Sequence, residues 1–244
     1  KLNGFDWVLQ LLMADIPVNK EELAEMGAGG LLMEIASRPL PRALAKSVNK
    51  REKKIMGVIL AAGNSTRMGK DNKLLKNIDG APLIRNIALE ITKSDLDSCS
   101  IVLGYQSDKV ADVIKDLNIN LILNPLWKEG QASSLKAALN SLTSSYSDLL
   151  IMLGDLPGIK SGHINRIIEE HLSSENRRSK ITIPSFKGEK GNPVIWGRSF
   201  FHDLSNLEGD VGGRVLFDQH PAAINLIEMD DPSVVTDTDT PEDF

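Results

Sequence analysis

The feature that most constrains the fold is a regular alternation between short apolar runs and segments with helical periodicity. Residues 55–62 read IMGVILAA, and a later segment repeats apolar residues at helical spacing from Ile84 to Ile91. A short apolar run indicates a strand buried on both faces, and strict alternation with helices implies parallel pairing with helices on both faces. The sequence therefore predicts an α/β fold with a mostly parallel sheet. We predict strands at 55–62, 100–104, 120–124, 148–153 and 180–184, with helices around 84–91, 110–117, 135–142 and 164–172.

The loop after the first strand is a candidate ligand site, because such sheets bind ligands at the carboxyl ends of their strands. It reads LAAGNSTRMGKDNKLL over residues 60–75. A P-loop has four residues between its glycines, followed by Lys and then Ser or Thr. Here five residues separate Gly63 from Gly69, and no hydroxyl residue follows Lys70. The dinucleotide fingerprint G-x-G-x-x-G is also absent from this loop, so a P-loop kinase or ATPase is disfavoured.

Two basic side chains give this loop another way to hold phosphates. Arg67 lies inside the glycine-bounded turn, and Lys73 follows the turn. Backbone N–H groups, a guanidinium and an ammonium can together hold a polyphosphate. A surface turn with solvated basic residues is the alternative interpretation.

Two aspartates are candidate ligands for a metal ion. Asp155 follows the strand at 148–153, and a carboxylate there could bind Mg²⁺ that bridges nucleotide phosphates. An Asx-type turn or a helix cap would need the same residue without a ligand. Asp210 lies in EGDVGGR, where it could bind metal or substrate, or could cap a helix expected at 211–217. Arg214 could meet a phosphate or lie exposed on that helix.

The segment WKEGQASSL opens the helix at 135–142. Gly130 and Ser134 lie where free helical N–H groups would attract anions or polar base edges. Ser133 or Ser134 could instead cap the helix. Trp127 is expected to pack rather than to stack on a base. In the same way, Ser107 is expected to cap the helix at 110–117.

Composition excludes several classes of function. A net charge of −5 argues against a nucleic-acid-binding surface, and no apolar run approaches the roughly 18 residues of a membrane span. The single cysteine, Cys99, excludes an intrachain disulfide framework, fits a reducing cytoplasm and is expected to be a small buried hydrophobe. The four histidines have no metal-ligand spacing, and no Ser–His–acid or Cys–His arrangement indicates nucleophilic catalysis.

A proline-containing basic segment divides the chain. Residues 37–54 hold two prolines and seven basic residues with almost no apolar periodicity, which indicates a linker. Residues 1–36 are expected to form short helices, too few for a core of their own. The chain starts KLNGFDW, without methionine, so these residues are expected to be the remnant of a preceding domain. The alternating pattern occupies residues 55–244.

The loop at 60–75 resembles the signature loop of the nucleotidyltransferases, especially the molybdenum cofactor nucleotidyltransferases. Four further stretches agree in order and spacing: WKEGQASSL, MLGDLPGI, GNPVIW with LEGDVGGRVL, and the final DTDTPEDF. This resemblance covers residues 56–244. The first 54 residues resemble, over a short stretch, the tail of a molybdopterin-binding domain.

The resemblance implies a nucleotidyltransferase fold, similar to glycosyltransferase A and Rossmann folds, and a set of site residues. Arg67, Lys73 and Asp155 would be catalytic, with Mg²⁺ on Asp155 and Asp210. Because three residues separate Gly69 from Lys73, Lys70 and Lys73 both remain candidates to face the phosphates. The nucleotide would be bound by Leu60, Ala61, Ala62, Gly63, Arg67, Gly69, Lys73, Gly130 and Ser134, and the second substrate by Asn192, Asp210 and Arg214.

The double alanine of LAAG resembles the cytidylyltransferase branch, whereas the guanylyltransferase branch usually carries LAGG. The resemblance thus implies CTP and molybdenum-molybdopterin as substrates, with a molybdenum hydroxylase or its chaperone as a partner. A guanylyltransferase, a sugar-phosphate nucleotidyltransferase and a non-catalytic cofactor carrier remain as alternatives.

Overall fold

The computed structural model describes residues 54–64 and 72–237, which belong to a compact unit spanning residues 52–244. The expected helical remnant at 1–36, nearly all of the linker at 37–54, and the final TPED lie outside the described residues. So do Arg67, Gly69 and Lys70.

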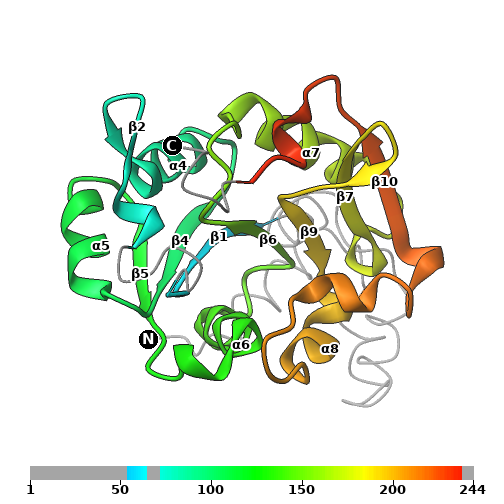
Figure 1. Ribbon diagram of the computed structural model, residues 1–244. Coiled ribbons are helices and arrows are strands. Elements are labelled where there is room, and N and C mark those ends of the chain that lie inside the picture. Colours follow the sequence, from blue (N-terminus) through cyan, green and yellow to red (C-terminus); the bar gives the residue numbers. More distant parts are fainter. Residues whose placement is uncertain (1–53, 65–71, 238–244) are drawn as a thin grey trace, which may run out of the picture. The chain divides into compact units, whose positions relative to one another are not determined.

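Apart from a small antiparallel hairpin at residues 77–82 that was not predicted, the described elements follow the predicted alternation as far as residue 186 (Figure 1). All five predicted strands and all four predicted helices are present. The strands are β1 (Ile55–Ala61), β2 (Asn77–Ile78), β3 (Ala81–Pro82), β4 (Ser98–Leu103), β5 (Asn120–Leu123), β6 (Asp148–Leu153), β7 (Ile181–Phe186), β8 (Glu189–Lys190), β9 (Val194–Gly197) and β10 (Ile224–Glu228). The α-helices are α4 (Leu83–Thr92), α5 (Ser107–Ile114), α6 (Gln131–Ser141), α7 (Ser161–Ser173) and α8 (Phe201–Ser205).

The main sheet is mostly parallel, as predicted. Its order is β10-β7-β9-β6-β1-β4-β5, with β8 paired to β7. The pairs of β1 with β4 and β6, of β4 with β5, and of β7 with β10 are parallel. Strand β9 is antiparallel to both β6 and β7. No helix separates β7 from β9, because a tight turn with positive φ at Lys187 and Gly188 reverses the chain into β8.

The two faces of the sheet bury different sets of β1 side chains. Successive strand residues point to opposite faces, so Ile55 and Ile59 join one apolar cluster and Met56 and Val58 join another. The first cluster includes residues of α4, α5 and α7, and the second includes residues of α6 and α8. Figure 1 shows α4 and α7 on one side of the sheet, and α6 and α8 on the other. Helices therefore cover both faces, as predicted.

Two predictions about helix starts are wrong. Ser107 is the first residue of α5 rather than its cap, because Gln106, with φ of +50°, precedes the helix. The helix expected at 211–217 is only a short 3₁₀ turn at Gly213–Leu216, since three glycines between residues 209 and 213 disfavour a longer helix.

Cys99 is half-buried rather than fully buried. Its Sγ donates to the carbonyl oxygen of Ile91 at 3.4 Å, and desolvation raises the pKa of the thiol to about 11. Over residues 54–64 and 72–237, no group of three or more His, Cys, Asp or Glu side chains is arranged to hold a metal ion. Across the same residues, no helix has the length and apolar character to span a bilayer.

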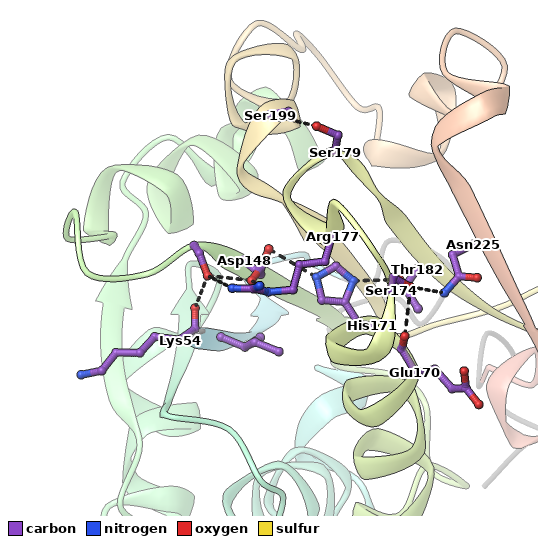
Figure 2. A network of polar contacts seen from close by, with 12 residues as sticks. Lys54, Asp148, Glu170, His171, Ser174, Arg177, Ser179, Thr182, Ser199 and Asn225 are labelled. Atoms are coloured by element: carbon purple, nitrogen blue, oxygen red, sulfur yellow. Dashed lines mark hydrogen bonds and ion pairs between the residues drawn. The ribbon is translucent and has the colours of Figure 1, made fainter. Parts of the chain in front are cut away.

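A buried polar cluster lies at the amino end of β6. Asp148 is fully buried, and its Oδ2 accepts from Ser147 Oγ at 2.7 Å and from Arg177 Nε at 3.2 Å. Its Oδ1 lies 3.3 Å from His171 Nε2, while His171 Nδ1 lies 2.8 Å from Thr182 Oγ1 (Figure 2). The cluster links side chains of β6, α7, β7 and the turn after α7. These polar contacts therefore hold the four segments together inside the protein.

Candidate functional site

A cavity of about 810 Å³ opens at the carboxyl ends of β1 and β6, beside the start of α6. The two strands are parallel neighbours, with Leu60 opposite Leu153, so the residues that follow them meet at one edge of the sheet. The cavity is lined by residues 60–64, 73, 74, 127–131, 134, 153–155 and 210.

The charged centre of the cavity is an ion pair between Lys73 and Asp155. Lys73 Nζ lies 2.7 Å from Asp155 Oδ2, and the two side chains are only 13% and 20% exposed. Partial shielding from water makes such a pair stronger than one on the open surface.

The backbone at both ends of this ion pair is fixed. Lys73 begins a 3₁₀ turn capped by the buried Asn72, whose Oδ1 accepts from Leu74 N at 3.1 Å. On the other side, Gly154 N donates to Leu60 O at 3.0 Å and so joins the turn after β6 to the end of β1. The adjustable part of the pair is therefore the long lysine side chain.

The start of α6 corrects one expectation. Gln131 N donates to Asp210 Oδ1 at 3.2 Å, and Ala132 N donates to Gly209 O at 3.2 Å. These N–H groups were expected to be free for an anion, but the loop at 209–210 already uses them. Gly130 has φ of +99°, and a Cβ there would lie 2.5 Å from Asp210 N, so only glycine fits this close approach.

A buried asparagine supports the cavity wall. Asn124 Nδ2 donates to Ser133 Oγ at 2.8 Å and to Ser134 Oγ at 3.1 Å, and its Oδ1 accepts from Leu126 N. Ser133 and Ser134 therefore lie inside α6 and do not cap it. Sequence reasoning missed Asn124, although its place directly after an apolar strand was a usable signal.

Trp127 both packs and faces the cavity. Its ring centroid lies 5.6 Å from that of Tyr105, and it contacts the apolar cluster that contains Ala62. A Cβ on Gly104 would lie 2.6 Å from Trp127 Cβ and 2.8 Å from Ala62 Cβ. Gly104 thus lets the Ala62 methyl and the tryptophan approach each other beside the cavity.

The structure brings most of the predicted site residues together. Neither Asn192 nor Arg214 is among the described residues that line the cavity: Asn192 N donates to Val234 O, and Arg214 Nη2 donates to Lys190 O at 2.7 Å. The predicted residues that line it are Leu60, Ala61, Ala62, Gly63, Lys73, Gly130, Ser134, Asp155 and Asp210. Sequence reasoning did not include the lining residues Asn64, Leu74, Lys128, Glu129, Gln131, Leu153 and Gly154.

The carboxylates of the cavity fit a hard divalent cation. Asp155 and Asp210 both line it, and magnesium in phosphate sites takes one or two carboxylates and completes its shell with phosphate oxygens and water. Such a site needs no larger cluster of protein ligands.

Comparison with known proteins identifies a family and several relatives. Residues 57–224 match the MobA-like NTP transferase domain. Nicotine blue oxidoreductase from Paenarthrobacter nicotinovorans is 27% identical over 192 residues, which cover 77% of this chain and 93% of that protein. The bifunctional protein GlmU from Allorhizobium ampelinum is 34% identical over 151 residues, 61% of this chain; the match spans about a third (32%) of GlmU.

Solved structures share the fold. The Rv0371c homologue from Mycobacterium sp. strain JC1 superposes with a TM-score of 0.68 at 26% identity, covering 79% of this chain and 93% of that one. Rv0371c from Mycobacterium tuberculosis, solved in complex with manganese, gives 0.64 at 23% identity, covering 78% and 95%. The family match extends over more than half of the sequence and includes most of β1, all of β6 and the residues that line the cavity at their carboxyl ends. The chain therefore belongs to the MobA-like NTP transferase family, a family of nucleotidyltransferases.

Proposed function

We propose that this chain transfers CMP from CTP to the terminal phosphate of the molybdenum-molybdopterin cofactor and releases pyrophosphate. The observation that carries the proposal is the ion pair of Lys73 and Asp155 inside a cavity formed by the loop after β1. An ammonium and a carboxylate in one cavity support the proposal, because a triphosphate attracts the first and its cation attracts the second. The choice of CTP and of the cofactor rests on the motif resemblance.

The proposed reaction needs no covalent intermediate on the protein. A terminal phosphate oxygen of the cofactor attacks the α-phosphorus of CTP, the bond to the bridging oxygen breaks, and pyrophosphate leaves with that oxygen. Arg67 and Lys73 neutralise the phosphates, and the Gly63 loop offers backbone N–H groups. Asp155 and Asp210 would hold Mg²⁺, which would supply positive charge against the phosphates. Asn192 and Arg214 are assigned to the second substrate by resemblance alone.

A pyrophosphate-release assay tests this proposal. We expect release with CTP plus purified molybdenum-molybdopterin, and little with ATP, GTP or UTP. Release with GTP would identify a guanylyltransferase, and release with a sugar phosphate as acceptor would identify a sugar-phosphate nucleotidyltransferase. Cofactor binding without pyrophosphate release from any nucleotide would favour a carrier that delivers the cofactor to a molybdenum hydroxylase. Because one relative is named nicotine blue oxidoreductase, a parallel assay with nicotine blue is a useful control.

Base preference is expected to depend partly on Ala62. Its methyl packs beside Trp127 at the cavity, so replacement by glycine frees space next to the ring. We predict that Ala62→Gly raises kcat/KM for GTP relative to CTP by roughly 10-fold, since one methyl group in a pocket changes selectivity by about 10- to 200-fold.

The measurement is kcat/KM for both nucleotides in both proteins. Ala61→Gly is the matched control, because it removes the same group one residue earlier, on the opposite face of the sheet. A wild-type protein that already prefers GTP would make the cytidylyltransferase assignment wrong while leaving the transferase assignment intact.

A further inference from the structure

The ion pair between Lys73 and Asp155 joins the two residues that the proposed function assigns to different parts of one substrate complex. Asp155 is assigned to the cation and Lys73 to the phosphates. Yet Lys73 Nζ donates a hydrogen bond to Asp155 Oδ2 at 2.7 Å. An ammonium at hydrogen-bond distance from that oxygen weakens the binding of a divalent cation to Asp155, because the two positive charges repel each other.

We propose that Lys73 makes cation binding depend on nucleotide binding: it leaves Asp155 only when the phosphates offer its ammonium another anionic partner. The inference rests on the proposed function and concerns the regulation of the same site. Asp155 is then released to the cation at the moment when the nucleotide arrives.

The structure gives Lys73 the means to make this exchange. Its backbone is fixed by the Asn72 cap and by the buried Leu74, and Asp155 follows the anchored Gly154. Neither backbone segment has to move, because the lysine side chain has four flexible methylenes between anchor and charge. Both charged groups line the same cavity, so phosphates bound there lie within reach of the lysine.

The same geometry predicts a reciprocal effect. Linkage requires that, if the nucleotide increases the affinity for the cation, the cation increases the affinity for the nucleotide by the same factor. Without cation, Asp155 both repels the phosphates and retains Lys73. The pair therefore disfavours binding of either ligand alone and favours binding of the two together.

The first test measures binding of Mn²⁺ alone to the full chain, by electron paramagnetic resonance of the free ion. We expect Lys73→Met to bind Mn²⁺ at least ~10-fold more tightly than wild type, because the competing ammonium is gone. Lys73→Arg keeps the charge and should stay within about 3-fold of wild type. Lys73→Gln repeats the test with a polar side chain, and thermal melting verifies that each variant is folded.

Lys128→Met is the matched control for a general charge effect. Lys128 lines the same cavity, but its Nζ lies 5.5 Å from the ring centroid of Trp127, and it is not in the ion pair with Asp155. We expect its Mn²⁺ affinity to change less than about 3-fold. An equal gain in Lys128→Met, or no gain in folded Lys73→Met and Lys73→Gln, would overturn the proposal.

The second test measures binding of CTP in the presence of a chelator. Asp155→Asn releases Lys73, so it should bind metal-free CTP at least ~3-fold more tightly than wild type. Asp210→Asn also removes a carboxylate charge from this cavity, but the Asp210 carboxylate contacts Gln131 of α6. Its affinity for metal-free CTP should therefore increase less than that of Asp155→Asn. If wild type releases pyrophosphate but neither the Mn²⁺ affinity nor the affinity for metal-free CTP increases in these variants, the proposed role of Lys73 is wrong and the proposed function stands. If both affinities increase but no nucleotide yields pyrophosphate, the role of Lys73 stands and the proposed transferase activity is wrong.

Discussion

Replacing Asp155 with asparagine is expected to reduce turnover at least ~100-fold, a loss of about 3 kcal/mol of transition-state stabilisation. Asparagine keeps the shape of the side chain and one oxygen, but it removes the charge that a divalent cation needs. Asp155 lies in a turn fixed by Gly154, so the fold should survive the substitution, although loss of the partly shielded ion pair with Lys73 should lower the melting temperature, and turnover is compared well below it. The measurement is steady-state pyrophosphate release together with a thermal melt.

Glu129→Gln is the matched control for this prediction. Glu129 is an exposed carboxylate that lines the same cavity without being part of the ion pair with Lys73. Removing its charge should reduce turnover by less than about 10-fold, because an exposed charge is screened by solvent. Near-normal turnover in Asp155→Asn, or an equal loss in Glu129→Gln, would contradict the metal-binding role of Asp155.

The parallel core of the fold could be predicted because its strands are buried on both faces. Residues 55–62 and 149–153 carry no polar side chain, and such runs are visible without a structure. Strand β9 was harder to predict. It pairs antiparallel between β6 and β7, and its pairing is set by a turn at Lys187 and Gly188, which a pattern of alternating strands and helices does not predict. Strand β10 has only one buried residue, Ile227, and therefore lacks an apolar run.

The candidate site was predictable where it follows the ends of strands. The loop after β1 and the turn at Gly154 and Asp155 meet because the two strands are neighbours. The contact of Asp210 with the start of α6 could not be predicted, since it joins residues 79 positions apart through a loop of irregular structure. The sequence predicted free N–H groups at the start of that helix, because nothing in it indicates that the loop at 209–210 accepts their hydrogen bonds.

The buried cluster at the other end of β6 is expected to contribute strongly to stability. Asp148→Ala should lower the free energy of unfolding by about 3–5 kcal/mol, because it removes the fully buried carboxylate to which Arg177 Nε and Ser147 Oγ both donate. It also removes the carboxylate next to His171, which is fully buried. For a domain of this size the loss corresponds to a fall in melting temperature of roughly 6–20 °C. Thermal and urea unfolding of the two proteins provide the measurement.

The expected loss comes from burial rather than from charge alone, and Asp112→Ala tests that distinction. Asp112 pairs with Lys115 at 2.8 Å, but both side chains are about 70% exposed, so this change should cost at most about 1 kcal/mol. In a double-mutant cycle, Arg177→Ala should cost less in the Asp148→Ala background than alone, because the guanidinium has then already lost its buried partner. Asp148 begins β6 and the cavity lies beyond its other end, so turnover measured well below the melting temperature should stay close to wild type. Equal melting temperatures for Asp148→Ala and Asp112→Ala would mean that the cluster does not stabilise the fold in this way.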